Sequence, residues 1–148
     1  MGGGEAGPRH RELAVAHAQS LTQTTDTANT IEWAKLALSS PKARVLRVTR
    51  IRYDGADHPI AFEEVVLALD RFPGLTANGG DIPDIIELGR RHGLSVGRAS
   101  ERVSIMAATK DVASHLGIAT GTNVLKLDRV VVTIDGEPVE WRIAFRKI

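Results

Sequence analysis

Residues 45–55, VLRVTRIRYDG, followed by residues 59–67, PIAFEEVVL, decide the fold class of this chain. Both segments are rich in valine, isoleucine and other residues that favour extended backbone. Between them, Asp54 and Gly55, followed shortly by Pro59, supply the chemistry of a turn. The pattern therefore predicts a β-hairpin with a slightly long loop.

A second version of this pattern begins at Val124, with VLKLDRVVVTIDG over residues 124–136. When Val45 is aligned with Val124, Arg50 coincides with Arg129 and Pro59 with Pro138. The two hairpins are therefore predicted to be the halves of an internal pseudo-repeat.

The second turn sets the expected strand register. If Asp135 and Gly136 form a two-residue turn, Ile134 faces Glu137, and counting back places Arg129 opposite Arg142. The same register in the first hairpin places Arg50 opposite Glu63. A slip of one residue would send every side chain to the other face of the sheet.

The remaining segments complete an α+β fold with an antiparallel β-sheet and flanking helices. We expect a helix within residues 81–93, capped by Asp81 and ended by Gly93, and a long strand over residues 95–109. A short helix over residues 110–116 should be capped by Thr109 and ended by Gly117. Residues 1–30 have the composition of a linker or a cloning-derived sequence, so we place the domain at residues 31–148.

Composition limits the classes of function. A chain of 148 residues, 43% hydrophobic, can form one core, and its formal net charge of +1 comes from mixed charges without a polybasic tract. Cysteine is absent, which excludes disulfides, thiolate metal sites and a cysteine nucleophile. The five histidines lack metal-ligand spacing, so neither a metal nor a cofactor is expected. Because no signal peptide or membrane span is recognisable, we expect a cytoplasmic protein.

Arg50 and Arg52 are the first candidates for a binding site. Two guanidinium groups two residues apart on a strand lie about 6 to 7 Å apart at the backbone, close enough to hold one carboxylate or phosphate. Arginines on a solvated face, or in structural ion pairs, would give the same pattern. The sequence leaves both interpretations open.

The order and spacing of RVTRIRYDG, HPIAFEE, FPGL, RRHGL and VASHLGIATGTNVLKLDRVVVTIDGEPVEW resemble the UTRA domain. This domain is the effector-binding half of HutC-type regulators in the GntR superfamily of bacterial transcription factors. The resemblance covers roughly residues 31–148 and implies a fold like that of chorismate lyase, with a small effector between sheet and helices. It also implies a homodimer, and DNA binding through a separate winged helix-turn-helix domain that we expect to be absent from this chain.

The resemblance also implies the site residues. Arg50 and Arg52 match the family's ligand-binding arginine pair, and Glu63 matches the acidic residue of the return strand. In the last strand, Glu140, Arg142 and Phe145 match the family pattern, although members commonly carry tyrosine at the Phe145 position.

The helix start near Asp84 departs from the family pattern. Sugar-phosphate sensors carry serine and tyrosine there, whereas this chain carries a carboxylate beside isoleucines. A carboxylate would repel a phosphate, so we expect a carboxylate-bearing or amine-bearing effector.

Two other classes of function remain open. A chorismate-lyase-like enzyme acting on a small carboxylate could use the same arginines and glutamate, but the sequence lacks a recognisable nucleophile and base, so no catalytic residue is expected. A pure dimerisation module could use the alternating apolar residues Val139, Trp141, Ile143 and Phe145 to pair across a two-fold axis.

Overall fold

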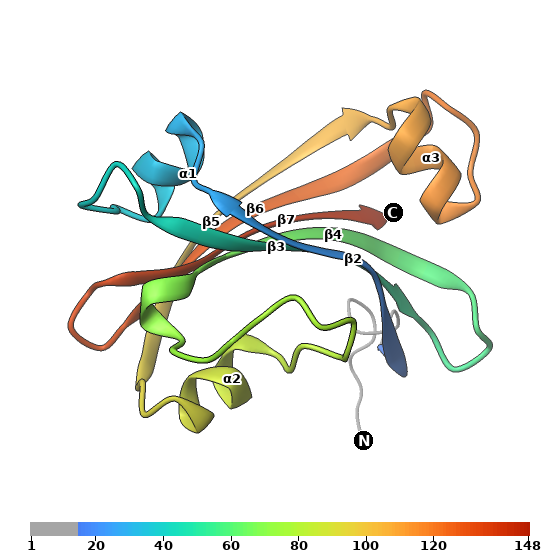
Figure 1. Ribbon diagram of the computed structural model, residues 1–148. Helices are drawn as coiled ribbons and strands as arrows, with labels where there is room; N and C mark the ends of the chain where they lie inside the picture. Colours follow the sequence, from blue (N-terminus) through green and yellow to red (C-terminus); the bar gives the residue numbers. More distant parts are fainter. Residues whose placement is uncertain (1–14) are drawn as a thin grey trace, which may run out of the picture.

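A computed structural model describes residues 15–148 and has one antiparallel sheet in the order β2-β3-β4-β7-β6-β5 (Figure 1). The strands are β2 (His17–Thr27), β3 (Arg44–Tyr53), β4 (Pro59–Ala68), β5 (Val96–Ala107), β6 (Asn123–Thr133) and β7 (Pro138–Lys147). The helices are α1 (Thr30–Lys35), the 3₁₀ turn η2 (Leu69–Arg71), α2 (Ile85–Arg91) and α3 (Lys110–Leu116). The predicted α+β class with an antiparallel sheet is confirmed.

Strand β2 lies in the segment that we expected to be a linker. It pairs antiparallel with β3 from His17 opposite Tyr53 to Thr27 opposite Arg44, with an irregularity between Ser20 and Thr22. Within residues 15–148 the first strand of the sheet thus begins at His17 and not near Thr30, while residues 1–14 lie outside the described part of the chain. The sequence of β2 resembles a linker because an edge strand needs no alternation of apolar side chains, and most of its residues are exposed.

Both predicted registers are confirmed: Arg50 lies opposite Glu63, and Arg129 lies opposite Arg142. The turn that was used to derive them is different. Thr133 accepts a hydrogen bond from the amide of Gly136 and donates one to the carbonyl of Glu137, so the predicted pairing of Ile134 with Glu137 is wrong. The pairing then shifts between Val131 and Val132, and this bulge restores the predicted register farther along the strands.

Helix α3 matches its prediction in full. Thr109 caps it by accepting a hydrogen bond from the amide of Val112, and Gly117 ends it in the left-handed conformation at φ +66°. Helix α2 begins later than predicted, at Ile85, with Asp84 and not Asp81 at the N-cap position. Pro83 favours extended backbone in the residue before it, which delays the start of the helix.

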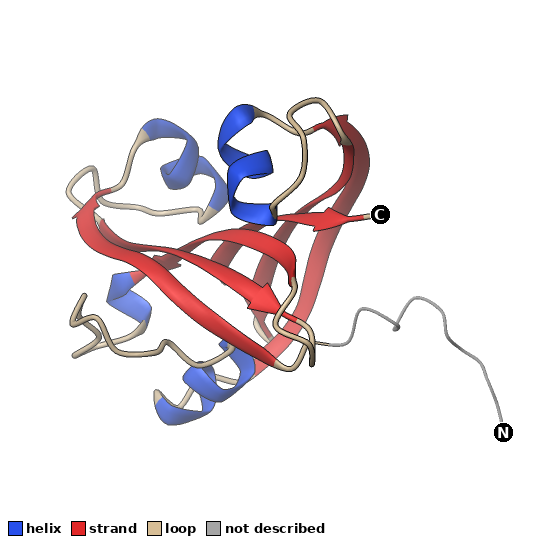
Figure 2. Cartoon of the chain, turned by 90° about the vertical axis from the view of Figure 1, so that its right-hand side faces the viewer, coloured by secondary structure: helices blue, strands red, loops and turns tan. Residues whose placement is uncertain are grey.

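The two faces of the sheet carry different helices. Figure 1 shows α1 and α3 on one side and α2 on the other, and Figure 2 shows the same layers from the side. On the α2 face a buried cluster comprises Leu46, Val48, Val65, Leu67, Phe72, Ile85, Leu88, Val131 and Val139. On the α3 face a second cluster comprises Ile51, Phe62, Ala108, Val112, Ala113, Leu116, Val124 and Phe145.

The strand order joins two three-stranded units, β2-β3-β4 and β5-β6-β7, through the β4–β7 pair. In each unit one helix connects the first strand to the second, α1 in the first unit and α3 in the second. An internal duplication would produce this arrangement, and the pseudo-repeat stays a prediction. Within residues 15–148 no helix is both long and apolar enough to cross a membrane.

Candidate functional site

A cavity of about 330 Å³ opens on the α2 face of the sheet. Four arginines and three carboxylates line it, and aliphatic side chains fill the space between them. The charged lining residues are Arg52, Arg129, Arg142, Arg146, Glu63, Asp84 and Glu101, and the aliphatic ones are Val15, Ala61, Ile85, Ile86, Leu127 and Ala144. The small side chains of Ala61 and Ala144, on the adjacent central strands β4 and β7, leave room above the sheet.

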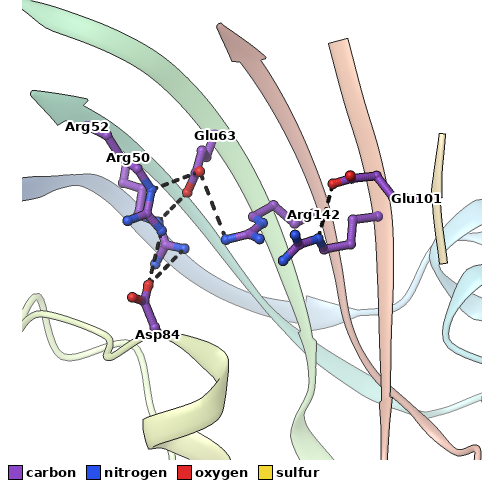
Figure 3. Close-up of polar contacts among 7 residues, drawn as sticks. Arg50, Arg52, Glu63, Asp84, Glu101 and Arg142 are labelled. Carbon is purple, nitrogen blue, oxygen red and sulfur yellow. Dashed lines mark hydrogen bonds and ion pairs between the residues drawn. The ribbon is translucent and has the colours of Figure 1, made fainter. Parts of the chain in front are cut away.

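Glu63 is the centre of the charge network (Figure 3). Its Oε1 accepts a hydrogen bond of 2.7 Å from Nε of Arg50, and its Oε2 accepts one of 2.9 Å from Nε of Arg52. Burial alone would raise the pKa of Glu63, but the charges of Arg50 and Arg52 outweigh burial and hold the pKa below its ordinary value. Glu63 is therefore an ionised, buried carboxylate that fixes both predicted arginines.

Asp84 joins this network from the start of α2. Nη2 of Arg52 donates a hydrogen bond of 3.0 Å to Oδ1 of Asp84, and Nη2 of Arg50 lies 4.0 Å from the same oxygen. Partial burial tends to raise the pKa of Asp84. The hydrogen bond and the charge of Arg52 lower it by a larger amount, so the pKa lies below its ordinary value. The carboxylate thus holds α2 against the arginine pair on β3.

Arg142 lies in the middle of the cavity with little pairing. Its Nη1 is 4.0 Å from Oε2 of Glu63, and its side chain donates no hydrogen bond to any other residue of the described chain. Only 16% of the side chain is exposed. By contrast, Nε of the nearby Arg129 donates a 3.2 Å hydrogen bond to Glu101. Arg142 is therefore a largely buried cation of the cavity lining, with its guanidinium turned toward Glu63 (Figure 3).

Two buried side-chain atoms in residues 15–148 have no hydrogen-bond partner, and both belong to predicted site residues: Nη2 of Arg50 and Oε1 of Glu140. Burial raises the pKa of Glu140, and the charges of Arg142 and Arg50 offset this only in part. Glu140 does not line the cavity but shares the electrostatic environment of the arginines around it. Buried polar atoms usually have partners, so these two atoms are exceptions within the described chain.

Phe145 does not reach this cavity. It belongs to the buried cluster on the α3 face, where its ring lies 6.4 Å from that of Phe62, measured between centroids. Side chains of adjacent residues on a strand point to opposite faces, so Phe145 lies on the other side of the sheet from Ala144 and Arg146. The structure therefore brings together Arg50, Arg52, Glu63, Asp84 and Arg142, with Glu140 nearby, and leaves Phe145 out.

Several lining residues were not among the predicted site residues. Arg146 and Ala144 follow from Arg142 by alternation along β7, a signal that was available in the sequence. Glu101 and Arg129 face each other across β5 and β6, but this register could not be derived before the β5 strand was placed. Ile86 and Val15 come from segments whose position over the sheet depends on the tertiary fold.

The lining sets four guanidinium groups against three carboxylates. Its described side chains are guanidinium, carboxylate and aliphatic groups. The depressed pKa values of Glu63 and Asp84 make both groups weak bases. Among residues 15–148, no group of three or more His, Asp or Glu side chains could hold a metal ion.

The sequence model of the UTRA domain family matches residues 14–146. One curated relative, the HTH-type transcriptional regulator Rv0792c of Mycobacterium tuberculosis, is 41% identical over 51 residues. This alignment covers 34% of the present chain and only 19% of the length of Rv0792c.

Solved structures share the fold. The ligand-binding domain of a protein assigned to the GntR family of transcriptional regulators from Bordetella bronchiseptica gives a TM-score of 0.80 at 23% identity, covering 88% of this chain and 83% of that one. A GntR-family transcriptional regulator from Enterococcus faecalis gives 0.78 at 22% identity, with 88% and 92% covered. PhnF from Mycobacterium smegmatis gives 0.75 at 21% identity, with 87% and 57% covered.

Proposed function

This chain belongs to the UTRA domain family, and on that premise we propose that it binds a small anionic effector in the arginine-lined cavity, as the sensing domain of a transcriptional regulator. Binding would shift the population between two arrangements of the domain and so alter DNA binding by a separate winged helix-turn-helix domain. The shift is limited by the difference in the effector's affinity for the two arrangements.

The observation that carries this proposal is that Arg142 is largely buried but weakly paired. Its largely buried guanidinium receives no hydrogen-bond acceptor from residues 15–148, which is costly unless an anion completes its environment. Arg142 lines the cavity together with Arg129 and Arg146, so the lining offers several cationic groups to one ligand. A cavity of about 330 Å³ suits a small metabolite.

The three carboxylates of the lining favour an effector whose anion is a carboxylate. Each carboxylate is already paired with an arginine: Glu63 with Arg52, Asp84 with Arg52, and Glu101 with Arg129. A second negative charge on a phosphate would increase the repulsion from them. An amine on the same ligand would find carboxylate oxygens within the cavity, which agrees with a carboxylate-bearing or amine-bearing metabolite.

The alternative of a chorismate-lyase-like enzyme has less support. The lining carboxylates are paired with arginines, and the pKa values of Glu63 and Asp84 are depressed, which disfavours general-base chemistry. The described lining also includes no serine, histidine or lysine that could act as a nucleophile. We therefore infer a sensor and not an enzyme.

The homodimer and the HutC-type assignment follow from the resemblance, the cytoplasmic location follows from the sequence pattern, and all three remain proposals. The predicted use of β7 for pairing between subunits is wrong, because β7 lies inside the sheet between β4 and β6. Val139 and Phe145 are also buried in the chain's own core. Strand β7 therefore cannot pair edge to edge with a second copy of the chain.

The proposed function is tested by thermal melting against amino-acid-derived acids, aromatic carboxylates, sugar phosphates and chorismate, with the chorismate sample assayed for pyruvate. A ligand at a hundred times its Kd should stabilise the folded chain by about 2.7 kcal/mol, a shift of several degrees in Tm. Arg142→Gln should lose that shift. Arg102→Gln is the matched control, because Arg102 is exposed on β5, at the edge of the same sheet, and lies outside the cavity lining.

Three results would contradict the proposal. Pyruvate release would identify an enzyme, and an equal shift in Arg142→Gln would remove Arg142 from the site. The absence of a shift from every compound in the panel would count against an effector of these classes.

A further inference from the structure

We propose that Asp84 is an internal counter-ion of the effector site: an effector anion displaces its carboxylate from Arg52, and the released side chain then caps helix α2. The inference rests on the proposed function and specifies how the same site selects its ligand and reports occupancy. Asp84 would thus be a specificity-determining residue and not merely part of the lining.

The first argument is the geometry of the contact. Oδ1 of Asp84 receives the only hydrogen bond given by Nη2 of Arg52 in the described chain, at 3.0 Å, and also lies 4.0 Å from Nη2 of Arg50. The Arg50 atom has no hydrogen-bond partner at all among the described residues. Asp84 therefore occupies the Nη2 donor of Arg52, which a ligand carboxylate would need.

The second argument concerns exchangeability. Glu63 and Asp84 both pair with Arg52, but the side chain of Glu63 is 6% exposed and that of Asp84 is 67% exposed. Glu63 also holds Nε of both arginines, whereas Asp84 has one hydrogen bond. Since exposed ion pairs are weak and readily replaced, a ligand anion would displace Asp84 and leave Glu63 in place.

The third argument comes from the helix caps. Asp84 is the N-cap residue of α2, with extended backbone at φ −58° and ψ 155°, but its side chain makes no capping hydrogen bond. In the same chain the N-cap side chains of Asn29 and Thr109 accept hydrogen bonds from the first turns of α1 and α3. Aspartate is among the preferred N-cap residues, so Asp84 has a second favourable position when it leaves Arg52.

These two positions give α2 two states. In the described state Asp84 ties the start of α2 to β3, and Ile85 and Ile86 form part of the cavity wall. When an anion takes Arg52, that tie is lost, and the carboxylate can accept hydrogen bonds from the amides of Ile86 or Glu87, at the N2 and N3 positions. A neutral ligand cannot displace a carboxylate from a guanidinium, so this exchange also selects for anions.

The binding test compares Asp84→Asn with the unmodified chain in NMR titrations with malonate and with inorganic phosphate at constant ionic strength. Without the internal carboxylate, the Kd for the anion should fall by about three- to tenfold. Asp81→Asn is the matched control, because Asp81 is an exposed aspartate of the same connecting segment and does not line the cavity. An equal or higher Kd in Asp84→Asn would overturn the proposal.

Amide hydrogen exchange supplies a readout that a purely structural role would not change. In the unmodified chain, saturation with anion should slow exchange at Ile86 or Glu87, because Asp84 becomes their acceptor. In Asp84→Ala the same saturation should leave these amides unchanged. Binding without slower exchange at either amide in the unmodified chain would refute the capping step.

Failure of this inference can be distinguished from failure of the proposed function. If anions bind and Arg142→Gln abolishes binding, while Asp84→Asn gives no gain, only the role assigned to Asp84 is refuted. If neither the unmodified chain nor Asp84→Asn binds any anion, the anion site itself is refuted, and this inference falls with it.

Discussion

At the scale of single residues, Glu63 controls the charge balance of the site. It pairs with Arg50, which is 4% exposed, and with Arg52, and its Oε2 lies 4.0 Å from Nη1 of Arg142. Burying an ion pair costs desolvation, and the attraction between the charges offsets this cost only while both partners are present. One carboxylate therefore makes it possible to keep several guanidinium groups beside an apolar core.

Replacement of Glu63 by glutamine should destabilise the chain strongly. It would leave the buried Arg50 without its hydrogen-bonded carboxylate, with only Asp84 at 4.0 Å, and breaking a buried pair in this way costs about 3 to 5 kcal/mol. Glu64→Gln is the matched control, since Glu64 is exposed and points to the opposite face, and its effect should stay below about 1 kcal/mol. Urea denaturation measures both, and equal effects would contradict the assigned role of Glu63.

The same variant gives a pH dependence with a definite sign. The pKa of Glu63 is depressed below 4.5 in the folded chain, so the unfolded chain takes up the proton first as the pH falls. The stabilisation that ionised Glu63 gives to the folded chain is therefore present above pH 4.5 and is lost as the pH falls through the folded-state pKa of Glu63. The difference in unfolding free energy between the unmodified chain and Glu63→Gln should shrink over this range, and a constant difference would contradict it.

Period-two alternation and one turn were sufficient to predict that Arg50 lies opposite Glu63. They could not predict the ion pairs that Asp84 makes, because α2 reaches the sheet through a long irregular segment. Alternation along β7 places Phe145 on the α3 face, away from Arg142, but the family match was followed instead.

At the scale of elements, β2 shows why an edge strand is difficult to predict. Thr22, Thr24, Thr25 and Thr27 favour extended backbone, but the strand lacks the apolar alternation that marks burial. Its pairing partner, β3, carries Arg50 and Arg52, so the position of the arginine pair depends on an element that resembles a linker. The turn before β7 also differs from its prediction. A bulge between Val131 and Val132 compensates for the difference, so the predicted register is still found farther along the strands.

A chain shortened to residues 31–148, the domain boundary expected from the sequence, should be much less stable than one comprising residues 15–148. The shorter chain loses all pairing along one edge of β3 and exposes the backbone of a strand that is otherwise interior. Circular dichroism melts and size-exclusion chromatography compare the two chains. Equal melting temperatures and a monodisperse short chain would show that β2 is dispensable.

At the scale of the whole molecule, the cavity lies across the junction of the two three-stranded units. Arg52 and Glu63 come from the first unit, Arg142 and Glu101 from the second, and Asp84 from the connection between them. A site assembled from segments so distant in sequence can be predicted only in part from local patterns. The position also suits a sensor, because a ligand that contacts both units can bias their relative arrangement.

The most direct test of the central claim is chemical-shift mapping of the chain with the panel compound that raises its Tm most. The account predicts the largest amide shifts around the cavity on the α2 face, at Ala61, Arg142, Ala144 and Ile86, and their loss in Arg142→Gln. Shifts confined to the opposite face, around Trp141 and Ile143, would contradict the account and place the effector site elsewhere.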